Sequence, residues 1–186
     1  MNKQQLRKKT VQKRKQLSLS SVKQKSNSIK KKLFSLEIFH TASSVLFYVS
    51  YDNEVDTHEM IKECLAMRKT VIVPKVLLDT QTLLLSRLQR WEDLEKGCYG
   101  ILEPKQSQIQ DVNINTLDLI IVPGIAFDIN KNRIGHGKGY YDKLLYQNEN
   151  IPTIGLAFEC QLVDVIDNED HDVKIDILIT EERIIT

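Results

Sequence analysis

Short, unbroken runs of aliphatic residues, separated by segments with helical spacing, place the strongest constraint on the fold of this chain. Asp118-Leu-Ile-Ile-Val122 contains such a run, and the run ends at Pro123-Gly124. A strand that is apolar on both faces is buried on both faces, which is typical of parallel sheets covered by helices. The pattern therefore predicts an α/β protein with a mostly parallel central sheet flanked by helices.

The rest of the chain alternates between helical and strand-like patterns. Helical spacing predicts helices over residues 2–16, 20–36, 56–67 and 140–146. Apolar runs predict strands over residues 44–49, 70–78, 83–88, 118–122, 153–157 and 175–179. Residues 79–82, Asp-Thr-Gln-Thr, match a hairpin turn, so one strand pair is antiparallel and the sheet is mixed. We expect Ser20 or Ser21 to cap the second helix, and Asp56, with Glu59 three residues later, to cap the third.

Length and composition indicate one globular domain, which we place over residues 1–186. A content of 41% hydrophobic and 27% charged residues is ordinary for a soluble enzyme. No segment approaches the roughly 18 apolar residues that span a membrane. Cys64, Cys98 and Cys160 are widely spaced and form no C-x-x-C pair, which indicates reduced thiols. We therefore expect a monomeric, cytoplasmic protein with no membrane partner.

The net charge of +1 hides an uneven distribution of charge. Residues 1–32 hold 12 of the 26 Lys and Arg residues, and no acidic residue precedes Glu37. Such a block suits a nucleic acid, a membrane surface or a polyanionic small molecule. However, Val22, Ile29 and Leu33 recur at helical spacing. A solvated lysine face on two packed helices therefore accounts for most of these charges.

Residues 133–142, Arg-Ile-Gly-His-Gly-Lys-Gly-Tyr-Tyr-Asp, carry the most informative motif and are called the glycine loop below. Three of the chain's seven glycines stand at alternate positions in it. Glycine accepts positive φ and close approach, so successive N–H groups can line an anion nest. With Arg133 and Lys138 as flanking cations and a helix starting just after it, the loop predicts a phosphate site. A plain turn is the alternative, and the spacing matches neither a P-loop nor a dinucleotide-binding fingerprint.

Two further loops carry polar residues after predicted strands. Ser50-Tyr-Asp-Asn-Glu-Val-Asp56 brings three carboxylates into one loop. A buried carboxylate at Glu54 could hold an N–H-rich heterocycle, although the pattern alone favours a solvated loop. In Pro123-Gly-Ile-Ala-Phe-Asp128, Phe127 is either a core or a site residue. No two histidines have metal-ligand spacing, so the sequence does not indicate zinc.

Taken in order, these segments resemble the 5-formyltetrahydrofolate cyclo-ligases, also called methenyltetrahydrofolate synthetases. The resemblance runs the whole length of the chain. Its motifs are Lys3-Gln-Gln-Leu-Arg7, Tyr48-Val-Ser50 with Glu54-Val-Asp-Thr57, Gly100-Ile-Leu-Glu-Pro104, Pro123-Gly-Ile-Ala-Phe-Asp128 with the glycine loop, and Asp176 with Ile179-Thr-Glu181. One departure is His136, which stands where the family pattern has Tyr or Phe.

The resemblance implies an ATP- and Mg²⁺-dependent ligase of one-carbon folate metabolism. Such an enzyme converts 5-formyltetrahydrofolate into 5,10-methenyltetrahydrofolate and releases ADP and phosphate. Transfer of the γ-phosphoryl group to the formyl oxygen makes an imidate phosphate, which N10 attacks to close the ring. In phosphoryl transfer, the protein contributes mainly by positioning the reactants and stabilising charge.

The resemblance also implies site residues, with Arg133 and Lys138 in the catalytic role. The implied nucleotide contacts are Lys3, Gln4, Gln5, Leu6, Arg7, Arg133, Ile134, Gly135, His136, Gly137, Lys138, Gly139, Tyr140 and Tyr141. The implied folate contacts are Tyr48, Ser50, Glu54 and Phe127, with Tyr140 or Tyr141 as further stacking partners. Asp142 and, more weakly, Asp176 are the implied Mg²⁺ ligands; a helix-end charge is the alternative for Asp142.

Two other classes of protein match parts of the pattern. The basic N-terminal segment could contact RNA or DNA, but no aromatic platform or named nucleic-acid fold accompanies it, so we expect no nucleic-acid partner. A sugar-phosphate isomerase or acyl-CoA transferase on a similar sheet could use the glycine loop for a simple phosphate. Either enzyme would need no ATP turnover, and fold analogy alone does not separate them.

Overall fold

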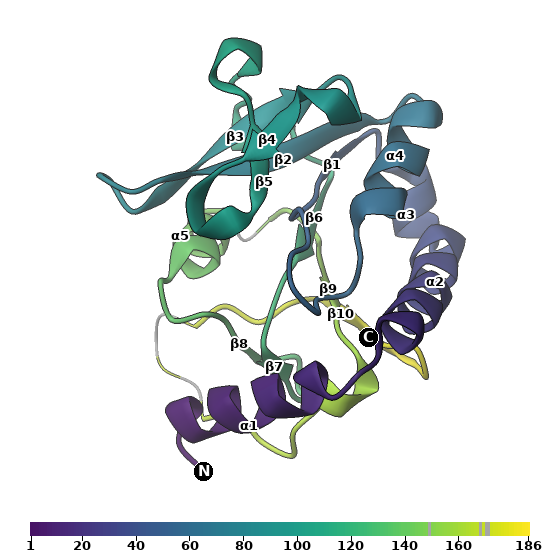
Figure 1. Ribbon diagram of the computed structural model, residues 1–186, viewed down its shortest axis with the longest axis vertical. Helices are drawn as coiled ribbons and strands as arrows, with labels where there is room; N and C mark the ends of the chain where they lie inside the picture. The colour runs from purple at the N-terminus through teal and green to yellow at the C-terminus, as the bar shows by residue number, and fades with distance from the viewer. Residues whose placement is uncertain (149, 168, 170–171) are drawn as a thin grey trace.

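A seven-stranded mixed sheet forms the centre of the molecule, in the order β11-β10-β9-β6-β1-β2-β3 (Figure 1). The computed structural model describes residues 1–148, 150–167, 169 and 172–186. The strands of this sheet are β1 (Ser44–Leu46), β2 (Thr70–Leu77), β3 (Thr82–Leu88), β6 (Leu119–Val122), β9 (Thr153–Leu156), β10 (Ile177–Ile179) and β11 (Ile184–Ile185). The pairs from β2 through β1, β6 and β9 to β10 are parallel, while β2–β3 and β10–β11 are antiparallel. The predicted fold class, a mixed and mostly parallel α/β sheet, is confirmed.

Helices lie on both sides of this sheet, as Figure 1 shows. The helices are α1 (Lys3–Lys15), α2 (Leu19–Ser35), α3 (Glu37–Thr41), α4 (His58–Ala66) and α5 (Tyr140–Tyr146). Three of them, α2, α3 and α4, line one side, α5 lies on the other, and α1 crosses the end near β7 and β8. Among the described residues, no helix is long and apolar enough to cross a membrane.

Neighbouring residues on the central strands point into two different hydrophobic clusters. Val45 and Ile121 pack with α2, α3 and α4 in one cluster, whereas Leu46 and Ile120 pack with Leu145 of α5 in the other. All four strand residues are fully buried. The period of two in a strand and the two helical layers therefore explain why these strands are apolar at every position.

Two predicted helix starts are wrong by one or two residues. Ser18, not Ser20 or Ser21, caps α2, because its hydroxyl accepts a hydrogen bond from the backbone N–H of Ser21 at 3.2 Å. At α4 the N-cap is Thr57, and Asp56 instead accepts a hydrogen bond from the His58 N–H at 2.9 Å. The Thr57 hydroxyl donates to the Tyr48 carbonyl at 2.7 Å, so the loop after β1 is tied to the start of the helix.

Four short strands that the apolar pattern does not predict form two small ribbons beside the sheet. They are β4 (Leu94–Lys96), β5 (Leu102–Pro104), β7 (Ala126–Phe127) and β8 (Arg133–Ile134). β4 pairs with β5, and β7 pairs with β8, both antiparallel. The second ribbon brings the glycine loop back beside the end of β6. These ribbons position two segments that line the candidate site.

Two carboxylates join the amino-terminal ends of neighbouring parallel strands. Asp118, just before β6, accepts hydrogen bonds from the backbone N–H groups of Ser43 and Ser44, at 2.9 and 2.8 Å. Asp176, just before β10, accepts hydrogen bonds from the N–H and hydroxyl of Thr153, both at 2.8 Å. Asp176 thus lies at the edge of the sheet opposite to the carboxyl ends of the strands.

Candidate active site

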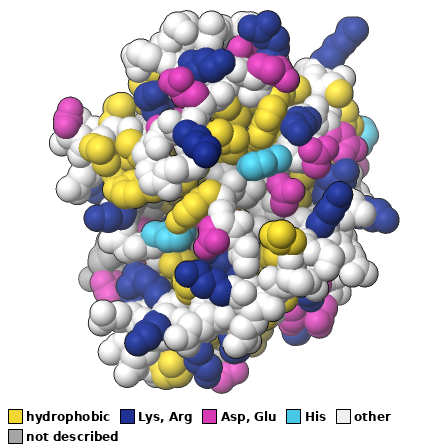
Figure 2. Space-filling model, viewed as in Figure 1, with side chains coloured by type: hydrophobic (Ala, Val, Ile, Leu, Met, Phe, Trp, Pro, Cys, Tyr) yellow, Lys and Arg dark blue, Asp and Glu magenta, His cyan; other side chains and the backbone are white. Residues whose placement is uncertain are grey.

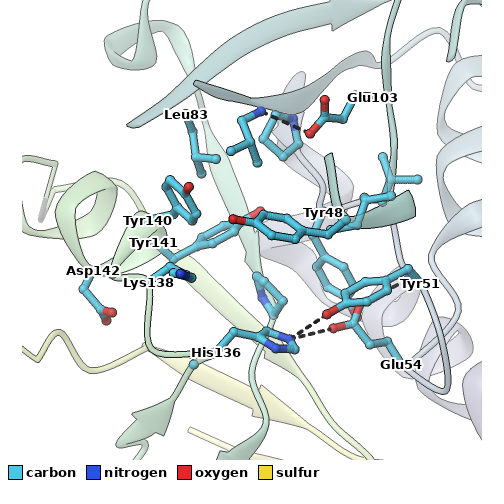
Figure 3. Close-up of a pocket in the computed structure, with 18 of the residues that line it drawn as sticks. Tyr48, Tyr51, Glu54, Leu83, Glu103, His136, Lys138, Tyr140, Tyr141 and Asp142 are labelled. Atoms are coloured by element: carbon cyan, nitrogen blue, oxygen red, sulfur yellow. Dashed lines mark hydrogen bonds and ion pairs between the residues drawn. The ribbon is translucent and has the colours of Figure 1, made fainter. Parts of the chain in front are cut away.

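A cavity of about 340 Å³ opens beyond the carboxyl ends of β1 and β6 (Figure 3). Its lining is mostly apolar and aromatic, from the loop after β1, the β2–β3 hairpin, the segment before β5, and α5. These residues are Tyr48, Val49, Pro74, Val76, Leu83, Tyr99, Ile101, Leu102, Tyr140 and Tyr141. A cavity of this size and character suits a flat heterocycle with an aromatic extension. It is called the first cavity below.

A buried carboxylate, Glu54, lies at one side of the first cavity. Only 6% of Glu54 is exposed, so the solvated-loop interpretation is wrong. One carboxylate oxygen accepts a hydrogen bond from the Tyr51 N–H at 3.2 Å, and the other lies 3.5 Å from His136 Nε2. Figure 3 shows His136 turned toward Tyr51 and Glu54. The family resemblance implies a nucleotide contact for His136, but its side chain faces the first cavity.

A second buried carboxylate, Glu103, lies at the opposite side of the same cavity. Glu103 accepts a hydrogen bond from the Val76 N–H at 3.3 Å and is 3% exposed. A Cβ atom at Gly97 would lie 2.2 Å from its carboxylate oxygen, so any larger residue there would have to move the Glu103 side chain. The Gly100-Ile-Leu-Glu-Pro104 motif therefore belongs to the wall of this cavity, although the sequence does not assign it a contact.

Three tyrosine side chains carry hydroxyl groups into or beside this wall. The Tyr48 hydroxyl donates to the Val55 carbonyl at 3.1 Å, and burial raises the pKa of Tyr48 well above its usual value. Burial also raises the pKa of Tyr141, whose hydroxyl is buried and has no hydrogen-bond partner among the described residues. Tyr140 lines the cavity next to Lys138 (Figure 3). The pKa of Tyr140 is raised as well, mainly by burial, so all three phenols are neutral over the physiological pH range.

The glycine loop separates this cavity from another of about 850 Å³, the second cavity. Its walls are α1, the glycine loop, α5 and part of the segment before β10. The side chain of Arg7 crosses from α1 and donates from Nε to the Gly135 carbonyl at 2.8 Å. Gly137 and Gly139 have φ of +86° and +70°, which explains glycine at these positions. Gly139 and Asp142 line both cavities, so the two spaces meet there.

Arg133 and Asp142 form an ion pair at this junction. Arg133 Nη2 donates to an Asp142 carboxylate oxygen, and the Arg133 side chain is almost fully buried. Burial lowers the pKa of the Arg133 guanidinium from its usual value. Its Nε is buried with no hydrogen-bond partner among the described residues. The Arg133 side chain therefore points toward Asp142, and its Nε–H group is available to a ligand.

The structure brings most of the predicted nucleotide contacts to the two cavities, but not all of them. Lys3, Gln4, Arg7, Gly137 and Gly139 line the second cavity, and Arg133, Gly135, His136, Lys138, Gly139, Tyr140 and Tyr141 line the first. Three of the predicted residues lie elsewhere. Leu6 and Ile134 pack together in a small core cluster, and the side chain of Gln5 accepts a hydrogen bond from the Asn2 N–H in a capping box.

Two of the predicted folate contacts also lie away from the first cavity. Phe127 is fully buried in the core, where it fills the space above Gly124 and Gly155. The Ser50 hydroxyl accepts a hydrogen bond from the Thr57 N–H at 3.0 Å and so shapes the loop that carries Glu54. Asp176, a predicted metal ligand, is held by Thr153 at the opposite edge of the sheet. The geometry therefore does not support contact of these three side chains with a ligand.

Several cavity residues have no signal in the sequence pattern. Lys143 and Tyr146 of α5, with Gln147 just after it, line the second cavity, together with Asp167, Glu169 and Asp172. Lys3 forms ion pairs with Glu169 and Asp172. These contacts join segments that are about 169 positions apart in the chain. Local spacing carries no information about such a pairing.

The fold and the position of the two cavities define the class of protein. Open α/β sheets hold their small-molecule ligands beyond the carboxyl ends of the strands, which is where both loops of this site lie. Figure 2 shows hydrophobic, acidic and histidine side chains gathered around the middle of this face. By architecture, the molecule is an α/β protein with two cavities beyond the carboxyl ends of its strands, where such folds hold small-molecule ligands.

Comparison with known proteins identifies the family. A family model described as the 5-formyltetrahydrofolate cyclo-ligase family matches residues 1–181. A 5-formyltetrahydrofolate cyclo-ligase of Haemophilus influenzae is 34% identical over 142 residues, or 74% of this chain and 76% of that protein. The structure of Aquifex aeolicus 5,10-methenyltetrahydrofolate synthetase matches with a TM-score of 0.87 and 34% identity, covering 99% of this chain and 92% of that one. A synthetase from Mycoplasma pneumoniae matches with a TM-score of 0.79, 25% identity, and 97% and 99% coverage. The chain belongs to the 5-formyltetrahydrofolate cyclo-ligase family, which confirms the resemblance in its motifs.

Proposed function

We propose that this protein converts 5-formyltetrahydrofolate into 5,10-methenyltetrahydrofolate with hydrolysis of ATP to ADP and phosphate. The observation that carries the proposal is the meeting of two unlike cavities at Gly139 and Asp142. One is aromatic with buried carboxylates, and the other is lined by the glycine loop and by charged side chains of both signs. A reaction that joins a heterocycle to a phosphate donor needs such a junction. We further propose that residues 1–186 act as one catalytic domain, and the expected monomeric state and cytoplasmic location stay predictions.

The first cavity has the features that a reduced folate requires. Its pterin ring carries several N–H donors, and Glu54 can accept two of them as an ionised carboxylate. Tyr48, Tyr140 and Tyr141 offer ring faces and edges for the pterin and the aminobenzoyl group. His136 Nε2 lies 3.5 Å from Glu54 Oε1, so His136 is the side chain that a bound pterin would displace from this carboxylate.

The residues that line the second cavity include groups that can bind a nucleoside triphosphate. Lys3 and Arg7 of α1 line this cavity; Arg7 contacts the glycine loop directly, and Lys3 is paired with Glu169 and Asp172. Lys138 is exposed at the first cavity, on the same loop, so its ammonium group can reach phosphates that pass through the junction. In this arrangement the γ-phosphate points toward the first cavity and the adenosine lies on the side of α5.

The residues at the junction fit a magnesium ion that is carried by the nucleotide. Mg²⁺ is commonly bound through one or two carboxylates and the substrate phosphates, so a single carboxylate at Asp142 is sufficient. Among the residues that the structure describes, no group of three or more His, Cys, Asp or Glu forms a metal cage. When bound, Mg²⁺ neutralises phosphate charge and orients the phosphoryl group. Asp142 would hold it and, in doing so, would release Arg133 toward the phosphates.

The chemistry then follows in two steps at the junction. The formyl oxygen attacks the γ-phosphorus, the bond to the β-phosphate oxygen breaks, and ADP leaves. The resulting imidate phosphate is attacked at its formyl carbon by N10, which loses its proton. Phosphate then departs with the former formyl oxygen and leaves the N5=CH–N10 bridge. Arg133 and Lys138 stabilise the charge on the transferring group, and the buried tyrosine wall excludes water from the intermediate.

The proposal is tested by following the absorbance of the methenyl product from 5-formyltetrahydrofolate, with and without Mg-ATP. We expect product only when both nucleotide and metal are present, with one ADP released per turnover. Product formation without nucleotide, or none with it, contradicts the proposal. Because the isomerase and transferase alternatives consume no ATP, the same assay separates them.

A further inference from the structure

Helix α1 is held against the protein by a buried stripe that is mainly polar. Its buried residues are Leu6, Thr10 and Arg14, four positions apart on one face. Leu6 packs against Ala126 and Ile134, but Arg14, at 3% exposure, brings a full positive charge out of water. A leucine there would bury apolar surface without a desolvation cost. A buried arginine at this position therefore needs a reason beyond helix packing.

The surroundings of Arg14 indicate that reason. Arg14 Nη1 lies 4.0 Å from Glu54 Oε1, and both side chains are almost fully buried. The Arg14 carbonyl also accepts a long hydrogen bond, 3.5 Å, from the side chain of Asn53 on the same loop as Glu54. The Arg14 Nε is buried with no hydrogen-bond partner among the described residues. The guanidinium therefore acts on Glu54 mainly through its charge, without closing the carboxylate off from a ligand.

The same helix reaches the second cavity at its other end. Lys3 and Arg7 line that cavity, and Arg7 donates to the Gly135 carbonyl. Lys3 and Arg14 are separated by about 16 Å along the helix axis, since an α-helix rises about 1.5 Å per residue. Helix α1 thus contacts the glycine loop with one turn and the Glu54 loop with another. Cationic side chains of a single helix thus reach both ligand loops.

We propose that Arg14 is a positioning residue for the Glu54 carboxylate, and that through it α1 couples nucleotide binding to folate binding. This inference rests on the proposed function. Nucleotide phosphates on Lys3 and Arg7 hold α1 in its docked position, and the docked helix keeps Arg14 beside Glu54. The Glu54 carboxylate is then oriented before the pterin arrives. By linkage, folate bound at Glu54 tightens nucleotide binding by the same factor.

The test is the dissociation constant of 5-formyltetrahydrofolate, measured with and without a non-hydrolysable ATP analogue and Mg²⁺. In the wild-type protein we expect the analogue to tighten folate binding by about fivefold or more. Arg14→Met keeps the length of the side chain and removes its charge, so folate binding weakens about tenfold and the analogue changes it less than twofold. Arg14→Lys restores part of both effects. The control is Lys13→Met, which removes an exposed charge from the neighbouring position of the same helix and leaves both values unchanged.

A second pair of variants separates positioning from a general loss of packing. If Arg14 acts through Glu54, adding Arg14→Met to Glu54→Gln costs no further folate affinity. This double variant has no unpaired buried carboxylate, so it decides the question even if Arg14→Met alone does not fold. The proposal is overturned if Arg14→Met weakens folate binding equally in the wild-type and Glu54→Gln proteins. It is also overturned if the ATP analogue tightens folate binding as much in Arg14→Met as in the wild type. Wild-type protein that binds no 5-formyltetrahydrofolate overturns the proposed function as well, whereas wild-type binding without coupling overturns only this inference.

Discussion

The side chain of Glu54 combines two properties that rarely occur together, a formal negative charge and almost complete burial. A carboxylate of this kind is retained only where cations or hydrogen-bond donors stabilise it. Arg14, His136 and the Tyr51 N–H surround it. Each is a weak or long contact, so the carboxylate keeps the capacity to accept stronger bonds from a ligand.

Replacement of Glu54 by Gln tests this role, because it conserves size and removes the anion. We expect folate binding to weaken by about 1.5–3 kcal/mol, the scale for a hydrogen bond to a charged group. Nucleotide binding in the absence of folate changes little. The measurement is calorimetric titration with each ligand, with the exposed Glu59→Gln as control. An unchanged folate affinity would show that Glu54 does not contact the pterin.

The ion pair between Arg133 and Asp142 gives a second prediction at the scale of single residues. If Asp142 holds Mg²⁺, Asp142→Asn raises the Mg²⁺ midpoint of activity and slows turnover by at least tenfold, while folate binding stays near normal. Arg133→Ala weakens ATP binding instead, and leaves the Mg²⁺ midpoint at saturating ATP similar. The measurement is a Mg²⁺ titration of activity for both variants, with folding checked by a thermal melt. If the Asp142→Asn enzyme melts at a lower temperature but keeps a normal Mg²⁺ midpoint, Asp142 serves only as the ion-pair partner of Arg133 and does not hold the metal.

At the scale of elements, the strand ends opposite the site are joined by carboxylates. Hydrogen bonds from Ser44 and Ser43 hold the pKa of Asp118 below its usual range. A carboxylate with a depressed pKa in the folded state contributes stability above its unfolded pKa of about 3.9. That contribution is lost as the pH falls through the lower, folded value.

Asp118→Asn should therefore lower the unfolding free energy at neutral pH by about 1 kcal/mol, at the low end for charged hydrogen bonds because solvent screens the carboxylate. The stability of the variant should also fall less steeply than that of the wild type below pH 4. Urea titrations at pH 7 and at pH 3.5 measure both effects. Asp79→Asn, in the exposed hairpin turn, serves as the matched control, and identical pH profiles for wild type and Asp118→Asn would refute the role.

The sequence predicts those elements whose apolar pattern is continuous. The run before Pro123 and the helix from Tyr140 to Tyr146 are found where their residues place them. The short ribbons β4–β5 and β7–β8 escape prediction because strands of two or three residues are too short to carry a periodic pattern. Their register depends on tertiary contacts such as the Val76 N–H bond to Glu103.

Across the whole molecule, the candidate site was predictable where motifs are local and not where it joins distant segments. The glycine loop stands out from residue type and spacing alone, whereas Glu54 is indicated only by the family resemblance, because its local pattern favours a solvated loop. Packing between elements determines three features that the motifs do not show. Glu54 is buried, His136 points toward it, and Phe127 lies in the core. Arg14 gave no sequence signal, because one more cation in a basic helix is indistinguishable from its neighbours until burial is known.

The central claim is that the two cavities bring the formyl oxygen of the folate and the γ-phosphate of ATP together at Asp142 and Gly139. It is tested most directly by an oxygen-transfer experiment. 5-Formyltetrahydrofolate labelled with ¹⁸O in the formyl group is converted by the enzyme in unlabelled water with Mg-ATP, and the released phosphate is analysed by mass spectrometry. We predict one ¹⁸O atom in each phosphate formed with product. Unlabelled phosphate, with the formyl oxygen lost to water, would contradict direct phosphoryl transfer at this junction.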